Sequence, residues 1–86
     1  MNRETILDKI TKERERQYQL PGSEFDMKNG PNDWVAIASK YLSEGSRFGG
    51  VTPSKEDFDD ALIKAAALIV AALEHSDHMK MEKRLK

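Results

Sequence analysis

Apolar residues recur at helical spacing in three stretches of this chain, and segments rich in proline and glycine separate them. The first stretch is mostly polar, with Ile6 and Ile10 as a thin apolar stripe and Asn2 where a helix N-cap is expected. Proline at position 21 disfavours helix at the residue before it and cannot donate a backbone hydrogen bond. The pattern predicts a polar N-terminal helix over residues 1–19, lying across a larger body.

A loop is predicted over residues 20–33, which hold two of the three prolines and two of the five glycines. A second helix is expected to start at Asn32 or Asp33. Its apolar residues fall at i, i+3, i+4, i+7 and i+8, on one face: Trp34, Ile37, Ala38, Tyr41 and Leu42. Gly45 is expected just past its end, in a left-handed conformation.

The third helix has the clearest start signal, because Ser54 followed by Asp57 reads as a capping box. Its apolar residues cover two faces: Phe58, Ala61, Leu62, Ala65, Leu68, Ile69, Ala72 and Leu73 on one, and Ile63, Ala67, Val70 and Ala71 on the other. A helix that is apolar nearly all round must be buried on more than one side. Residues 34–79 are therefore predicted to form a helical hairpin.

These elements predict an all-α fold, with three main helices forming a helical bundle completed by homo-oligomerisation through the third helix. Two short helices cannot easily cover the third one, and its many alanines let another helix approach closely. The alternative is a monomer in which the long loop folds over the second apolar face. The chain of 86 residues is expected to be one domain, 1–86, near the size at which a single core is barely sufficient.

The composition bears on the cellular location of the protein and on the kind of partner it can have. The chain has no cysteine, no apolar run long enough to cross a bilayer, and charged residues throughout its first dozen positions. We therefore expect a cytoplasmic protein without membrane association. The formal net charge of −1 argues against nucleic acid as a partner, and the polar, basic tail over residues 80–86 is interpreted as solubilising.

An acidic cluster is the strongest candidate metal site. Its members are Glu44, Glu56, Asp57, Asp59 and Asp60. Mg²⁺ prefers oxygen ligands, and carboxylates three residues apart share a helix face, so two such pairs could hold one ion. The alternative is that these acids only stabilise the start of a helix through its dipole.

Three runs characterise the chain: Glu13-Arg14-Glu15-Arg16-Gln17, Trp34-Val35-Ala36-Ile37, and Ala65-Ala66-Ala67-Leu68-Ile69-Val70-Ala71-Ala72-Leu73-Glu74. Their patterning, over most of the chain, resembles small phage-borne MazG-like proteins, which belong to the all-α nucleoside triphosphate pyrophosphohydrolases. The resemblance implies a helical bundle, usually a dimer or tetramer, in the host cytoplasm. It also implies hydrolysis of nucleoside triphosphates to monophosphate and pyrophosphate with Mg²⁺.

The metal motif of that superfamily is E-x-x-E on one helix and E-x-x-D on the next. The first motif matches only at Glu44, because Tyr41 stands three residues before it, with Lys40 beside it. The second matches at Glu56 and Asp59, although alignment on the alanine-rich run places it at Asp60 and Ile63 instead. The resemblance therefore implies a similar scaffold with impaired or absent catalysis.

Such a scaffold could bind a nucleotide without cutting it. Candidate phosphate and base contacts are Arg14, Arg16, Lys40 and Arg47, with Tyr18, Phe48 and Trp34. The alternatives are that Trp34 is a core residue and that Arg14 and Arg16 form a solvated helix face. The leading hypothesis is a catalytically degenerate MazG-like phage accessory protein that sequesters a nucleotide or nucleotide-derived signal.

Two further functions stay open, an active Mg²⁺-dependent pyrophosphohydrolase and a helical protein-protein adaptor. His75 and His78 could bind Zn²⁺ at i and i+3, or simply favour the end of the third helix. The chain contains neither a phosphate-cradling G-x-x-x-x-G-K-[ST] loop nor a G-x-S-x-G turn.

Overall fold

Three α-helices account for most of the residues that the computed structural model describes, which are 1–21 and 28–81. They are α1 (Arg3–Tyr18), α2 (Pro31–Ser43) and α3 (Lys55–His75), and a short 3-10 turn, η2 (Ser76–His78), follows α3. No strand occurs within these described ranges. The predicted all-α class with three main helices is confirmed, whereas completion by other copies stays a prediction.

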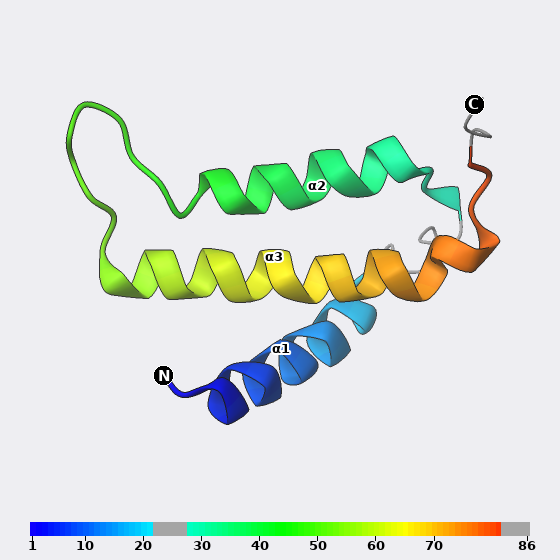
Figure 1. Ribbon diagram of the computed structural model, residues 1–86, viewed down its shortest axis with the longest axis horizontal. Helices are drawn as coiled ribbons and strands as arrows, with labels where there is room; N and C mark the ends of the chain where they lie inside the picture. Colours follow the sequence, from blue (N-terminus) through cyan, green and yellow to red (C-terminus); the bar gives the residue numbers. More distant parts are fainter. Residues whose placement is uncertain (22–27, 82–86) are drawn as a thin grey trace, which may run out of the picture.

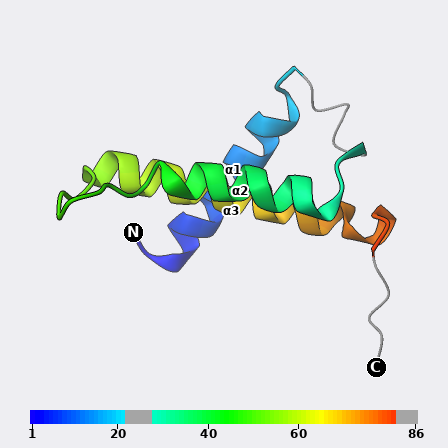
Figure 2. The ribbon, with the colours of Figure 1, turned by 90° about the horizontal axis from the view of Figure 1, so that it is seen from above.

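The longest helix, α3, is the centre of the arrangement, because both α1 and α2 pack against it. Figure 1 shows α2 running back alongside α3, so the two form the predicted hairpin. Seen from above, α2 lies over α3 and α1 crosses the pair obliquely (Figure 2). Different helices thus cover the two sides of α3, so α3 has one packing interface with α1 and another with α2.

The caps expected from the sequence are present at α1 and α3. The Asn2 Oδ1 atom accepts a hydrogen bond from the Thr5 N–H at 2.8 Å. The Ser54 Oγ atom accepts one from the Asp57 N–H at 3.0 Å. Each bond satisfies a backbone donor that lacks a partner within the helix, which fixes the residue at which the helix begins.

The start of α2 differs from the prediction by one or two residues. The helix begins at Pro31, with Gly30 as the N-cap. Proline is well suited to this first position, since its missing N–H would have no helical partner there. The Gly30 N–H donates to the Asp33 Oδ2 atom at 2.8 Å, so Asp33 stabilises the helix start from inside the helix. Residues 22–27 of the predicted loop lie outside the described residues, as do residues 82–86 of the predicted tail.

The prediction of a left-handed Gly45 is wrong. Among the described residues, positive φ occurs only at Gly49 and Gly50, with angles of 68° and 77°. A Cβ atom at position 45 would lie 3.2 Å from the Ala61 Cβ and 3.2 Å from the Leu62 Cδ1. Glycine is therefore needed here for close approach of the chain to α3, whereas the reversal of direction is made by the two later glycines.

The core is small and built mainly from alanine. The described residues that are fully buried and apolar are Trp34, Ala61, Ala65, Ala67 and Ala71. Trp34 is only 3% exposed, so the interpretation of this residue as core is confirmed. Alanines allow α1 and α2 to approach α3 closely, but they bury little apolar area per residue.

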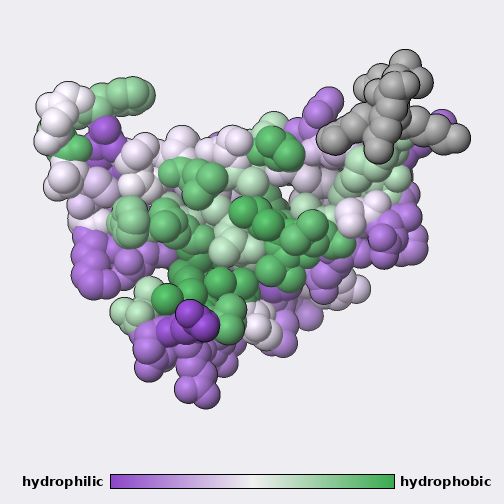
Figure 3. Space-filling view, viewed as in Figure 1, coloured by the Kyte–Doolittle hydropathy of each residue, from purple (hydrophilic) through white to green (hydrophobic). Residues whose placement is uncertain are grey.

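Large apolar side chains are left exposed along one side of α3. They recur at helical spacing at positions 58, 62, 69, 70 and 73, and exposure ranges from 38% at Leu62 to 67% at Leu73. Figure 3 shows apolar side chains gathered over α3 and its borders with the neighbouring helices. We call Phe58, Leu62, Ile69, Val70 and Leu73 the α3 stripe. Within the described residues, no helix is long and apolar enough to cross a membrane.

Candidate functional site

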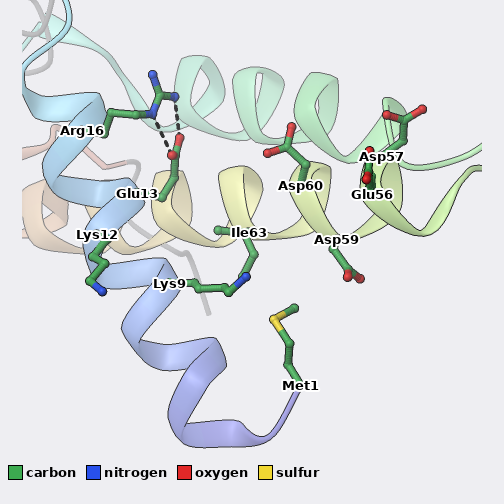
Figure 4. A pocket seen from close by; sticks show the side chains of 10 residues that line it. All are labelled: Met1, Lys9, Lys12, Glu13, Arg16, Glu56, Asp57, Asp59, Asp60 and Ile63. Carbon is green, nitrogen blue, oxygen red and sulfur yellow. Dashed lines mark hydrogen bonds and ion pairs between the residues drawn. The ribbon is translucent and has the colours of Figure 1, made fainter.

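A charged hollow of about 680 Å³ lies between α1 and the first half of α3 (Figure 4). Its residues come from the N-terminus, from one face of α1 and from the first turns of α3: Met1, Lys9, Lys12, Glu13, Arg16, Glu56, Asp57, Asp59, Asp60 and Ile63. Its volume falls within the roughly 300–1,000 Å³ that small-molecule sites span. The hollow brings a basic helix face opposite an acidic one.

The basic wall is contributed by α1. Lys9, Lys12 and Arg16 follow one another at i, i+3 and i+7, which places them on one side of the helix. The Lys12 Nζ atom lies 2.9 Å from the Asp8 Oδ2 atom, and this hydrogen bond raises the pKa of Lys12. This side of α1 is therefore a basic face.

Glu13 holds the Arg16 side chain of this wall in place. Arg16 donates to it through Nε at 2.8 Å and through Nη2 at 2.6 Å. These bonds from Arg16 are the main reason that the pKa of Glu13 is lowered, and they outweigh the opposing effect of burial. The Gln17 Nε2 atom donates both to Glu13 Oε2 and to the backbone oxygen of Lys64, each at 3.2 Å, which ties α1 to α3.

The acidic wall is contributed by the first turns of α3. Asp59 is paired with Lys55, and the Asp60 Oδ2 atom lies 2.9 Å from the Lys64 Nζ atom. Hydrogen bonding to Asp60 raises the pKa of Lys64. Because each pair joins residues four apart on one helix and has one exposed partner, it contributes little to stability and can open at small cost.

Four of the five acidic residues predicted as a metal site line this hollow, and the fifth does not. Glu56, Asp57, Asp59 and Asp60 line it, whereas Glu44 is the C-cap residue of α2 and lies elsewhere. Both registers proposed for the second family motif therefore reach the same hollow, since Ile63 lines it too. In the part of the chain that the structure describes, no three acidic or histidine side chains lie close enough to hold a metal ion together.

The seven predicted nucleotide contacts do not share one pocket. Only Arg16 lines the charged hollow, and Arg14 and Trp34 line a separate cavity. The other four line neither of these two cavities: Tyr18, Lys40, Arg47 and Phe48. Phe48 is 97% exposed, in the turn between α2 and α3.

Two of those arginines have structural partners that the sequence did not indicate. The Arg14 Nε atom donates to Glu74 Oε1 at 2.7 Å, and its guanidinium lies over the Tyr18 ring, 5.6 Å from the centroid. Arg47 donates to the backbone oxygens of Glu44 and Ser46 and to the Asp57 carboxylate. Arg14 therefore joins α1 to the end of α3, and Arg47 holds the turn onto the start of α3.

His75 packs against the core. Its ring is stacked on that of Trp34, with centroids 5.6 Å apart and planes inclined by 19°. Within the described residues, no group containing His75 and His78 has the three ligands that a metal site needs. The contact instead fixes the orientation of the tryptophan at the end of α3.

The basic wall was not among the site residues predicted from the sequence, because Lys9 and Lys12 lie in a run of mixed charges. Such runs are usually solvated helix faces. The signal was their spacing with Arg16, which places all three on one side of α1. No protein-family model, curated protein or solved structure matches this chain.

Proposed function

We propose that this protein binds a nucleotide in the charged hollow, as a MazG-like scaffold that no longer cuts its ligand. One observation supports this: the basic face of α1 and the acidic face of α3 line the same hollow. Phosphate groups bind to Lys and Arg, while Mg²⁺ binds carboxylates together with phosphate oxygens. A nucleotide with its metal ion therefore matches both walls.

The basic wall would hold the phosphates. Lys9 has no ion pair within the described part of the chain. Lys12 would lose only its exposed ion pair with Asp8 on binding a phosphate. Arg16 is held in place by Glu13, and its remaining N–H groups are available. Binding would therefore cost little reorganisation of α1.

The acidic wall would hold the metal ion. Glu56 has no ion pair within the described residues, and the Asp59 and Asp60 pairs with lysine each have one exposed and one half-buried partner. One or two carboxylates suffice for a Mg²⁺ that keeps several waters and takes its other ligands from phosphate. The family's hydrolysis uses the carboxylates of both motifs. Of the first motif only Glu44 is retained, and it lies outside the hollow. Binding without cleavage is therefore the function we propose.

We infer that a second copy of the chain covers the α3 stripe. The buried core consists of one tryptophan and four alanines, whereas five larger apolar side chains of α3 are substantially exposed. Burying these in a two-fold interface would add apolar area that the isolated chain lacks. The formal net charge of −1 gives little repulsion between copies. We place this assembly in the cytoplasm, of the host cell if the gene is phage-borne, since the chain has no cysteine to oxidise.

The binding proposal is tested by isothermal titration with linear and cyclic nucleotides, each with and without Mg²⁺. The double variant Lys9→Glu with Lys12→Glu should weaken binding at least tenfold. Lys40→Glu, a matched charge change on α2 away from the hollow, should leave it unchanged. Absence of binding by every nucleotide would sink the proposal.

Catalysis is tested in the same samples by measuring released pyrophosphate. We expect none. Its appearance, and its loss in Glu56→Gln, would replace the binding proposal with an active pyrophosphohydrolase.

The second copy is tested by sedimentation equilibrium. Leu62→Glu with Ile69→Glu should convert the assembly to monomers, whereas Val35→Glu, an equally apolar exposed position on α2, should not. A wild-type protein that is monomeric at all concentrations would overturn the homo-oligomer and favour an adaptor that uses the stripe for another protein.

A further inference from the structure

The α3 stripe has the same spacing of large side chains when it is followed from either end. Four of its members lie on one line along the helix, because eleven residues make almost three turns at roughly 3.6 residues per turn. They are Phe58, Leu62, Ile69 and Leu73, and the half-buried Ala66 lies in the middle of the same line. The midpoint between the two outer members and the midpoint between the two inner members both fall between Ala65 and Ala66.

This symmetry matches a second α3 that runs in the opposite direction. A two-fold interface brings the same surface of both copies together, so the surface must be complementary to itself. With the axis between Ala65 and Ala66, Phe58 would lie opposite the partner's Leu73, and Leu62 opposite the partner's Ile69. Every large side chain of the line would then meet another large apolar side chain, and the small Ala66 at the centre would let the two helices approach closely.

The charges of α3 favour the antiparallel direction over the parallel one. Four acids lie in its first six residues: Glu56, Asp57, Asp59 and Asp60. A parallel pair of helices would place these acids beside the same acids of the partner, and like charges repel. In the antiparallel pair the two acidic groups lie about 22 Å apart along the axis, at roughly 1.5 Å per residue. That distance exceeds the screening length of about 8 Å at physiological salt, so the repulsion is largely removed.

The line is accessible to a second copy, and it uses other residues than the charged hollow does. Its exposed fractions are 46% at Phe58, 38% at Leu62, 45% at Ile69 and 67% at Leu73. Figure 3 shows apolar side chains gathered over α3 on the face that it presents. None of the four residues lines the charged hollow. A second copy on this line would therefore leave the lining residues of the hollow in place.

We propose that two copies of the chain pack through antiparallel α3 helices, with the two-fold axis between Ala65 and Ala66. This arrangement rests on the homo-oligomer proposed above and adds the direction and register of the contact. Because each charged hollow lies beside the first half of its own α3, the two hollows lie towards opposite ends of the pair.

Cysteine cross-linking tests the position of the axis, since the chain has no cysteine of its own. Ala66→Cys lies next to the axis and should form a disulfide with the same residue of a second copy under mild oxidation. Val35→Cys, at a position of α2 that is 66% exposed, is the matched control. Its dimer band on a non-reducing gel should form at least tenfold more slowly, and the two rates should become equal in urea.

The direction is tested by mixing Leu62→Cys with Ile69→Cys, one of them carrying a short tag that separates the products by size. In the antiparallel register, position 62 lies opposite position 69 of the partner, whereas the two copies of position 62 lie about 10 Å apart along the axis. A disulfide needs Cα atoms within about 7 Å of each other. Mixed disulfides should therefore exceed like disulfides at least tenfold. Phe58→Cys mixed with Leu73→Cys tests the same register if circular dichroism shows that either of the first two variants is unfolded.

Sedimentation equilibrium of the wild-type protein distinguishes the two ways in which the proposal can fail. If the protein is a dimer and like disulfides prevail, or if Ala66→Cys reacts no faster than the control, the antiparallel register is overturned and the homo-oligomer stands. If the protein is a monomer at all concentrations, both proposals are overturned. Neither result bears on nucleotide binding, which is measured separately in the charged hollow.

Discussion

The two halves of α3 have opposite surroundings. The first half, Lys55–Lys64, presents its acids to a charged hollow whose ion pairs lie mostly at the surface. The second half, Ala65–His75, lies beside Trp34, the largest buried side chain among the described residues, and beside a second cavity. Surface pairs contribute little to stability, whereas burial of an aromatic side chain contributes several kcal/mol.

We therefore expect the second half of α3 to matter most for folding and the first half to matter most for ligand binding. The largest buried side chain in the described part of the chain lies beside the second half, whereas the exposed acids of the first half are available for a charged ligand. Substitutions of Trp34 should therefore cost the most stability, while substitutions of the acids in the hollow should change binding with little effect on folding. The predictions below test that division from its strongest expected effect to its weakest.

Trp34→Ala should destabilise the fold most. Removing a buried aromatic side chain costs about 3–5 kcal/mol, because transfer free energy is lost and a cavity remains. The other buried apolar residues in the described part of the chain are alanines, which are too small to fill the space. Urea denaturation followed by circular dichroism should show a much lower midpoint or no folded baseline. Trp34→Phe keeps most of the burial and should retain a cooperative transition. A loss below about 1 kcal/mol in the alanine variant would mean that the core lies elsewhere.

Gly45→Ala should be the next most damaging change, although it adds only one methyl group. The new Cβ would lie 3.2 Å from the Ala61 Cβ, which cannot rotate away, so α3 or the end of α2 must shift. Overpacking of this kind costs about 1–3 kcal/mol. Thermal unfolding measures the effect, and Ser46→Ala at the exposed neighbouring position is the control. An unchanged midpoint would mean that the turn moves freely away from α3.

Glu13→Gln should have a smaller effect that depends on pH. Arg16 lowers the pKa of Glu13 in the folded protein, so the charged carboxylate stabilises the fold at neutral pH. This contribution is lost as the pH falls through the lowered pKa. We expect the variant to be about 1 kcal/mol less stable at neutral pH, with the difference vanishing in acid. Glu15→Gln, exposed on the same helix, should show no such convergence. A difference that is constant with pH would contradict the role of the Glu13 charge.

The sequence was sufficient for the three helices, because apolar spacing, Asn2, Ser54 and the prolines are local signals. It was not sufficient for Gly45, whose role depends on the approach of Ala61 from sixteen positions further along the chain. The candidate site shows the same limit. The acidic residues were identified as a cluster, but the lysines opposite them come from α1, and only the crossing of α1 over α3 brings the two groups together.

Long-range pairing also explains why Arg14 was assigned to a nucleotide site. Its partner, Glu74, is sixty positions away, and nothing in the local run of alternating charges indicates it. Spacing along one helix predicts which side chains share a face, but not what faces them. The sequence therefore predicts which charged residues of α1 and α3 share a helix face. It does not predict which residues on the other helix they pair with.

Glu56→Gln with Asp59→Asn should have the smallest effect on folding and so gives the sharpest test of the division. Both side chains lie in the first half of α3, and within the described residues they form one ion pair, Asp59 with Lys55, whose lysine is largely exposed. Surface substitutions of this kind usually change stability by no more than about 0.5 kcal/mol, so the unfolding midpoint should stay close to that of the wild type. Nucleotide binding should persist without Mg²⁺, because the basic wall of α1 is intact, but its enhancement by Mg²⁺ should disappear. Asp77→Asn, at the other end of the molecule in η2, removes a similar exposed charge and should leave the Mg²⁺ effect unchanged. A double variant that unfolds would show that the acidic wall supports the fold, and one that retains full Mg²⁺ enhancement would place the metal ion outside the hollow.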